Sequence, residues 1–224
     1  MSKTVIYFMP GLAASPKIFE NLSLPTDQYE LYYLTWLKPL SIKESLANYA
    51  KRLCKEIKHS NIVLIGVSFG GIVIQEMSKY VDVKKLIIIS SIKSYNEFSN
   101  NFRFAKKLKA YSLFPTKVIS NFDKFKYFFI GKYLKKKAKL YETYLSERDE
   151  LYLNWSIRNV LLWKQEYPIE GLVHIQGTKD PIFPVKKIKN YIAIKGGTHA
   201  MILLRAKKIS KIIETTLTDK NTII

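Results

Sequence analysis

One serine of the sequence occupies a motif that could make it a nucleophile. Ser68 is the centre of Gly66-Val67-Ser68-Phe69-Gly70, with a glycine two residues away on each side. This spacing suits a sharp turn between a strand and a helix, which raises the serine Oγ above the edge of a sheet. A serine hydroxyl is a weak nucleophile unless a base lies within hydrogen-bond reach. The motif therefore predicts attack on a carbonyl carbon, provided that the chain supplies a base at the same place.

Three histidines are the candidates for this base. His59 ends a predicted helix before the strand that leads to Ser68, which places it at the opposite edge of the sheet. His174 lies inside a predicted strand, where a buried histidine with satisfied hydrogen bonds is the ordinary interpretation. His199 follows the last predicted strand, in the sequence KGGTHAMI, at the same edge as Ser68. We therefore predict His199 as the base by elimination.

A carboxylate must orient the imidazole and stabilise its protonated form. Asp180 follows the fifth predicted strand in HIQGTKDPIFP, directly before a proline that ends any extension of that strand. This position is at the same sheet edge, so we predict Asp180 as the acid. An aspartate that caps a loop or a helix is the alternative interpretation of Asp180. Glu97, shortly after the fourth predicted strand, is the alternative acid.

These side chains need a sheet to hold them, and six short apolar segments predict one. The predicted strands are residues 4–11, 29–36, 61–68, 84–91, 172–177 and 190–197. Nearly continuous apolar strands joined through helices favour a mainly parallel sheet with both faces covered. Ser41 and Glu44 have the spacing of a capping box, and the apolar stripe beyond them predicts a helix from Ser41 to about residue 58. Similar stripes predict helices after Ser68 and over 203–217.

The segment 92–170 interrupts this alternation, because it contains no obvious core strand. Residues 93–139 hold thirteen basic side chains and two acidic ones, interleaved with aromatic residues. An insertion after the carboxyl end of a strand lies where open α/β sheets bind ligands, so we interpret 92–170 as a helical lid within one domain over 1–224. Trp155 and Trp163 are expected to pack this lid on the domain.

The net charge of +19 suggests an anionic partner, but 32 of the 37 basic residues are lysine. Specific phosphate and base recognition tends to use the arginine fork, and no nucleic-acid reader motif is present, so we expect no nucleic-acid partner. A composition biased towards Lys, Ile, Asn and Tyr explains the excess equally well. The single cysteine, Cys54, excludes an intramolecular disulfide and a cysteine-rich metal site. With no apolar run long enough to span a bilayer, these features lead us to expect a cytoplasmic protein.

The order Ser68, Asp180, His199 along the chain resembles that of the α/β-hydrolase superfamily. The resemblance covers essentially the whole sequence and is closest to small, single-domain serine esterase-like members. It implies an oxyanion hole made of two backbone N–H groups, that of Phe69 and one from the loop after the first strand, for which we choose Leu12. Many relatives carry His-Gly where this chain has Pro10-Gly11.

The resemblance implies a serine hydrolase that cleaves an ester or thioester of a small or acyl-chain substrate through an acyl-enzyme on Ser68, with no cofactor and no metal. Acyl transfer and lyase chemistry are alternatives on the same fold. A non-catalytic protein that binds an anionic surface through the basic lid is an alternative of another class. Weak contact of this lid with an anionic membrane surface is also compatible with the enzyme.

Overall fold

The six apolar segments form the strands of one sheet in the computed structural model, which describes residues 2–108 and 143–218. The strands are β1 (Thr4–Met9), β2 (Tyr29–Tyr33), β3 (Ile62–Val67), β4 (Val83–Ile89), β5 (Val173–Gly177) and β6 (Ile192–Ile194). Their order across the sheet is β2-β1-β3-β4-β5-β6, and every neighbouring pair is parallel. The predicted α/β fold with a parallel six-stranded sheet is therefore confirmed.

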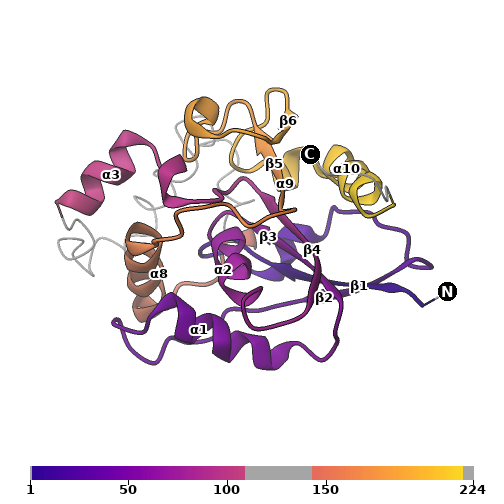
Figure 1. Cartoon of the computed structure of the whole chain (residues 1–224), viewed down its shortest axis with the longest axis horizontal. Coiled ribbons are helices and arrows are strands. Elements are labelled where there is room, and N and C mark those ends of the chain that lie inside the picture. Colours follow the sequence, from indigo (N-terminus) through magenta and orange to yellow (C-terminus); the bar gives the residue numbers. More distant parts are fainter. Residues whose placement is uncertain (1, 109–142, 219–224) are drawn as a thin grey trace.

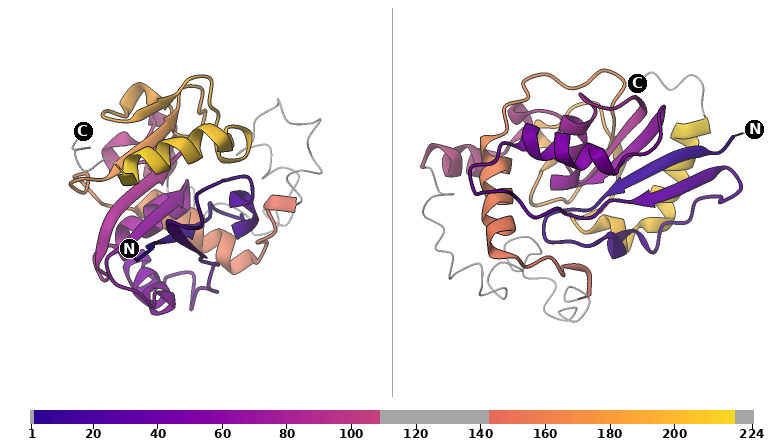
Figure 2. Two further views of the ribbon diagram at one scale, coloured as in Figure 1. Left: turned by 90° about the vertical axis from the view of Figure 1, so that its right-hand side faces the viewer. Right: turned by 90° about the horizontal axis from the view of Figure 1, so that it is seen from below.

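Helices cover both faces of this sheet. The helical elements of the described residues are α1 (Leu46–Leu53), α2 (Phe69–Met77), α3 (Asn100–Lys107), α8 (Glu150–Leu162), α9 (Met201–Leu204) and α10 (Ala206–Thr218), with short 3-10 turns η1 (Pro16–Phe19), η2 (Cys54–Glu56), η3 (Tyr95–Glu97) and η5 (Val185–Lys187). One face packs against α1, α2 and α8, and the other against η1, α9 and α10 (Figures 1 and 2). All six residues of β3 are buried, which explains the unbroken apolar character of that strand. None of the helices in the described part of the chain is long and apolar enough to cross a membrane.

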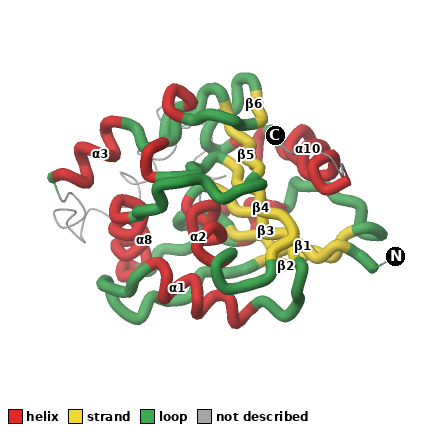
Figure 3. Tube along the Cα trace, in the orientation of Figure 1, coloured by secondary structure: helices red, strands yellow, loops and turns green. Residues whose placement is uncertain are grey.

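The carboxyl ends of the strands bring distant loops together at one edge. β2 lies on one side of β1 and β3 on the other, so the order of the strands reverses between β1 and β3 (Figure 3). The register pairs Met9 with Gly66, so the loop after β1 begins beside the turn after β3. On the other side of the sheet, Gly177 at the end of β5 pairs with Ile194 at the end of β6. Such an edge is where open α/β sheets bind ligands.

The first predicted helix is wrong at both ends. α1 begins after Ser45, whose Oγ accepts a hydrogen bond from the Asn48 N–H at 3.2 Å, so Ser45 and not Ser41 is the N-cap. The Glu44 carboxylate turns back to the Leu40 N–H at 2.7 Å and closes a loop ahead of the helix. The α-helix ends at Leu53 and is followed by the 3-10 turn η2. Local side-chain competition for backbone donors therefore moved the start of the helix by one turn.

The predicted insertion 92–170 is described at its two ends. Residues 109–142, which hold most of its basic side chains, lie outside the described residues, so the lid itself stays a prediction. At the described ends, η3 and α3 follow β4, and α8 precedes β5. The Trp155 ring lies 4.2 Å from Tyr49, and the Trp163 Nε1–H donates to Glu76 Oε1 at 2.9 Å. Both tryptophans therefore attach α8 to α1 and α2.

Candidate active site

The turn between β3 and α2 holds Ser68 in an unusual backbone conformation. Its φ is 53° and its ψ is −121°, a region that residues other than glycine rarely occupy. The Ser68 N–H donates to the Ile89 carbonyl at 2.9 Å, and the Ser68 carbonyl accepts from the Ser91 hydroxyl at 2.7 Å. The Gly71 N–H donates to the same carbonyl at 2.9 Å. The end of β4 and the first turn of α2 thus stabilise the strained serine.

The two glycines of the motif are required by the closeness of neighbouring backbone. A Cβ at Gly66 would lie 2.5 Å from the Gly70 carbonyl oxygen, and a Cβ at Gly70 would lie 2.3 Å from the Pro10 carbonyl oxygen. Contacts this short with backbone atoms cannot be relieved by a side-chain movement. The G-x-S-x-G spacing is therefore the spacing that lets α2 begin directly against the end of β1, with the serine between them.

The structure brings the predicted serine, histidine and aspartate into one hydrogen-bonded chain. His199 Nε2 lies 2.9 Å from Ser68 Oγ, and His199 Nδ1 lies 2.9 Å from Asp180 Oδ2. An ionised carboxylate only accepts hydrogen bonds, so Nδ1 carries the proton of the neutral imidazole. The lone pair of Nε2 then faces the Ser68 hydroxyl. This is the tautomer and the orientation in which the imidazole can accept the proton of the serine.

Asp180 is held by more donors than His199 alone. Its Oδ1 accepts the N–H groups of Ile182 at 2.8 Å and Phe183 at 3.0 Å, and its Oδ2 also accepts from Gln176 Nε2 at 3.1 Å. Burial would by itself raise the pKa of the Asp180 carboxyl, but His199 and these backbone donors outweigh it, so the pKa lies below its ordinary value. The carboxylate is therefore ionised and fixed in orientation at neutral pH.

Behind Asp180 lies a second buried pair, His174 and Gln176. The Gln176 Nε2 group donates to both Asp180 Oδ2 and the Phe183 carbonyl, so its Oε1 must face His174 Nε2, which lies 3.1 Å away. His174 Nε2 is therefore the donor of that bond. Burial, and then the charge of nearby Lys93, lower the pKa of His174 to about 3, so its imidazole is neutral. The predicted burial of His174 is confirmed, but its hydrogen bonds are not all satisfied, because Nδ1 has no partner among the described residues.

The other candidates for base and acid lie elsewhere. His59 Nδ1 bonds to the Tyr7 hydroxyl at 2.8 Å, ahead of β3 and away from the edge that carries Ser68. The buried Glu97 accepts the Lys93 N–H at 2.7 Å, and its carboxylate pairs with Lys93 Nζ at 3.5 Å. Burial raises the pKa of Glu97 in spite of the opposing effect of Lys93. The hydrogen-bonded partner of His199 is Asp180 and not the alternative acid Glu97.

The loop that follows β1, residues 11–15, lies against the serine. A Cβ at Gly11 would be 3.4 Å from Ser68 Cβ. The Ala14 N–H donates to the Gly11 carbonyl at 3.0 Å, and Ala13 has a φ of 63°, the pattern of a type II turn with Leu12 at its second position. Within residues 2–108 and 143–218, neither the Leu12 nor the Phe69 N–H has a hydrogen-bond partner. No described residue therefore occupies either of these backbone donors.

Two aromatic residues that the sequence interpretation did not single out hold the 11–15 loop. Trp36 Nε1–H lies between two carbonyl oxygens, 3.2 Å from that of Gly11 and 3.1 Å from that of Ala14. The Tyr152 hydroxyl accepts the Ala13 N–H at 3.2 Å. A tryptophan at the end of a predicted strand and a tyrosine in a predicted lid carry no local signal of these contacts. Nor do the described residues gather three or more His, Cys, Asp or Glu side chains that could hold a metal ion.

The parallel sheet, the strained serine turn after β3 and the loops after β5 and β6 define the α/β-hydrolase fold. Solved structures agree: an esterase from Thermogutta terrifontis has a TM-score of 0.69 at 10% identity, over 96% of this chain and 90% of that chain. A bromoperoxidase from Bacillus anthracis gives 0.67 at 15% identity, over 97% and 93% of the two chains. An epoxide hydrolase from Bacillus megaterium gives 0.71 at 16% identity, over 98% and 96%.

The TM-scores and coverages establish the fold. The low identities leave the reaction open, because the three structures bear the names of three activities. At the level of sequence, no family model matches the chain, and no curated protein is significantly similar to it. The choice of chemistry therefore depends on the side chains at the edge of the sheet.

Proposed function

We propose that this protein is a serine hydrolase that cleaves a carboxylic ester or thioester through an acyl-enzyme on Ser68. The observation that carries the proposal is the chain of two 2.9 Å contacts, from Ser68 Oγ to His199 and from His199 to Asp180. A hydroxyl nucleophile, a neutral base and an ionised acid in this order form the arrangement that activates a serine for acyl transfer. The strained turn presents the hydroxyl at the ligand-binding edge of the sheet.

In the first half of the proposed reaction, Ser68 Oγ attacks the carbonyl carbon and its proton passes to His199 Nε2. Asp180 stabilises the imidazolium that forms. The carbonyl oxygen becomes an oxyanion, for which the N–H groups of Leu12 and Phe69 are the proposed donors. Collapse of the tetrahedral intermediate breaks the bond to the alcohol or thiol, which leaves with the proton from Nε2. The acyl group remains on Ser68 as an ester.

In the second half, a water molecule gives one proton to His199 Nε2 and attacks the acyl carbon. The second intermediate collapses, the carboxylic acid leaves, and Ser68 Oγ recovers its proton from Nε2. In each half His199 acts first as a base and then as an acid, while Ser68 is the nucleophile in the first half and the leaving group in the second. No electron transfer and no added group is needed to balance these steps.

The proposal is tested by labelling the purified protein with a fluorophosphonate, which reacts covalently with activated serines. We expect one label per chain on the wild type and none on Ser68→Ala, with ester turnover reduced by about 10⁶-fold in that variant. Ser78→Ala, which changes a serine at the far end of α2, is the matched control and should label normally. A folded wild type that takes no label and hydrolyses no member of a chain-length series of chromogenic esters and acyl thioesters contradicts the proposal.

A further inference from the structure

We propose that Tyr152 of α8 is a positioning residue for the oxyanion hole, because it fixes the turn that carries the Leu12 N–H. This inference rests on the proposed function and goes beyond it, since Tyr152 lies in the 92–170 insertion and does not belong to the Ser68 chain of hydrogen bonds. In effect, a segment of the insertion shapes the site from the side opposite to Asp180.

Three hydrogen bonds join the 11–15 loop to the end of the insertion. The Ala13 N–H donates to the Tyr152 hydroxyl at 3.2 Å, and the Ala13 carbonyl accepts the Glu147 N–H at 3.0 Å. The Ser15 N–H donates to the Tyr144 carbonyl at 3.1 Å. Both peptide groups that flank the Cα of Ala13 are therefore bonded to residues more than 130 positions later in the chain. Of the three bonds, the one to Tyr152 is the only one that a side chain supplies.

Ala13 needs these partners because its own backbone preference opposes the turn. Its φ of 63° is in the left-handed region, which costs a residue with a Cβ about 1 kcal/mol relative to the ordinary regions. If Ala13 returned to a negative φ, the peptide groups on either side would rotate. The Leu12 N–H shares its peptide group with the Gly11 carbonyl, which accepts the Ala14 N–H at 3.0 Å. Loss of the turn would break that bond, so the direction of the Leu12 N–H would change. An N–H that must point at a developing oxyanion is sensitive to such a change.

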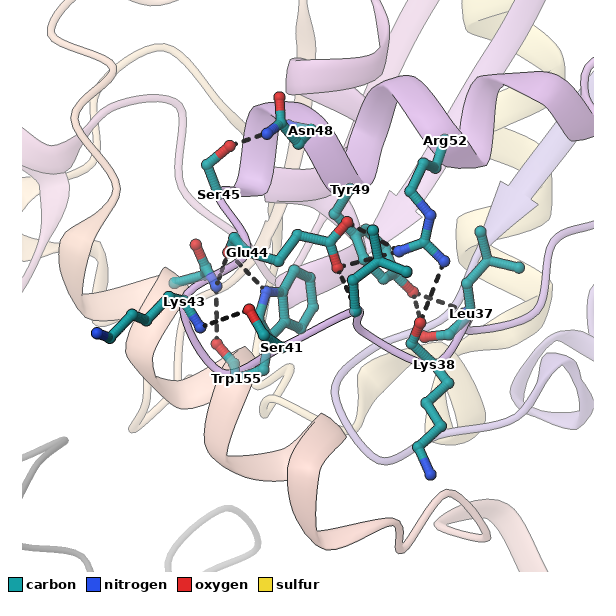
Figure 4. Close-up of polar contacts among 12 residues, drawn as sticks. Leu37, Lys38, Ser41, Lys43, Glu44, Ser45, Asn48, Tyr49, Arg52 and Trp155 are labelled. Atoms are coloured by element: carbon teal, nitrogen blue, oxygen red, sulfur yellow. Dashed lines mark hydrogen bonds and ion pairs between the residues drawn. The ribbon is translucent and has the colours of Figure 1, made fainter.

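Tyr152 is itself held firmly in place. Its backbone N–H donates to the Asp149 carboxylate at 2.8 Å, which caps the start of α8. One turn further on, the Trp155 Nε1–H donates to the Glu44 carbonyl at 2.8 Å. Figure 4 shows the Trp155 indole beside Glu44, in the segment just ahead of α1. The Glu44 carboxylate there accepts a hydrogen bond from Arg52 at 2.8 Å. α8 is therefore attached to the start of α1, and the Tyr152 hydroxyl has a defined position relative to the sheet.

An aromatic cluster, made of the rings of Trp36, Phe69 and Tyr152, connects the two proposed oxyanion donors. The Trp36 ring stacks on the Phe69 ring at 5.3 Å with an interplanar angle of 8°, and it lies 5.1 Å from the Tyr152 ring. Trp36 also donates to the carbonyls of Gly11 and Ala14. Burial raises the pKa of Tyr152 well above its ordinary value, so its hydroxyl stays neutral and acts through its position and not as an acid or base.

The test is Tyr152→Phe, which removes the hydroxyl and keeps the ring. We expect kcat for a chromogenic ester to fall about tenfold with KM changed less than twofold, because the lost interaction concerns the transition state. The affinity for a trifluoromethyl ketone, which forms a tetrahedral adduct with a serine, should fall by the same factor as kcat. A purely structural role would lower the melting temperature without this parallel loss of kcat and of affinity for the ketone.

Tyr7→Phe is the matched control. The Tyr7 hydroxyl is also buried and also accepts a backbone N–H, that of Lys58 at 3.1 Å, but at the opposite edge of the sheet. The Tyr7→Phe variant should therefore be less stable than the wild type but keep the wild-type kcat. If Tyr152→Phe does not fold, Glu147→Pro removes the N–H that bonds to the Ala13 carbonyl and should give the same loss of kcat.

Two outcomes overturn the inference. One is wild-type kcat and wild-type affinity for the ketone in the folded Tyr152→Phe protein, or in Glu147→Pro when that variant has to take its place. The other is an equal loss in Tyr7→Phe. Failure of the proposed function is a separate result, because the wild type itself would then take no fluorophosphonate label.

Discussion

The two sides of Ser68 are supported in different ways. On the acid side, the carboxylate of Asp180 takes its fixed donors from its own neighbourhood: Gln176 lies four residues before it, and Ile182 and Phe183 lie two and three residues after it. On the oxyanion side, which is formed by the 11–15 loop, the donors and acceptors come from residues far away in the sequence. The Tyr152 hydroxyl that bonds Ala13 lies 139 residues later in the chain.

This difference has a physical consequence. A local cluster is assembled as soon as the end of β5 and its following turn have formed, because few residues separate its members. The 11–15 loop reaches its bonded form only when α8 has docked on α1 and α2. We therefore expect the acid side to be the more robust of the two, and the side of the proposed oxyanion donors to depend on the packing of α8.

The largest effect is expected from the acid itself. Asp180→Asn keeps the size of the side chain but puts an amide in place of the carboxylate, so the imidazole is no longer held with the proton on Nδ1 and is not stabilised when protonated. We expect kcat to fall about 10⁴-fold, as measured with a chromogenic ester. The circular dichroism spectrum should remain that of the wild type. A folded variant with less than a tenfold loss would remove Asp180 from the mechanism.

On the oxyanion side, Leu12→Pro deletes the proposed N–H donor. Proline is favoured at the second position of a type II turn, which is where Leu12 lies, so the backbone can accept it. Loss of one oxyanion donor costs about 10²- to 10³-fold in kcat. The measurement is kcat with the same ester.

Leu12→Ala serves as the comparison for this variant, because it keeps the N–H and removes most of the buried side chain. The ratio of kcat between Leu12→Ala and Leu12→Pro isolates the effect of the donor. A ratio near one would assign the second donor to another group of the 11–15 loop.

A smaller effect is expected from Gln176, which donates a hydrogen bond to Asp180. Gln176→Met keeps the approximate volume and removes the amide that donates to Asp180 Oδ2. Because Oδ1 retains two backbone N–H donors, the carboxylate should stay in place, and we expect kcat to fall only about tenfold. If kcat falls as far as in Asp180→Asn, the local cluster is less redundant than its geometry indicates.

The sequence predicts the residues of the acid side but few of the contacts on the oxyanion side. The reason is again that the first are local in the sequence and the second are not. Ser68 ends one predicted strand, and Asp180 and His199 each follow another. Parallel strands end at one edge, so the meeting of these residues follows from topology. The contacts of Trp36 and Tyr152 depend on how α8 packs, which no local pattern encodes. The start of α1 was misplaced because Ser41 and Ser45 both offer a cap, and the choice depends on the Leu40 N–H taking the Glu44 carboxylate.

The smallest effect on turnover, but a distinct effect on stability, is expected at His174. Its pKa is lowered to about 3 in the fold, by burial and then by Lys93, whereas in an unfolded chain it would be about 6.5. Between these two values the unfolded chain binds a proton that the folded chain does not. The free energy of unfolding therefore falls as the pH is lowered through this window, by at most about 1.4 kcal/mol per pH unit from this group.

His174→Gln removes this titration while its amide can still donate to Gln176. We expect the variant to be less stable than the wild type at pH 7, with a gap that narrows steadily as the pH falls towards 4, in urea denaturation series at each pH. Asp180 is present in both proteins, so its titration largely cancels in the difference. Parallel stability curves would mean that the pKa of His174 is the same in the folded and the unfolded chain, which contradicts the lowered pKa.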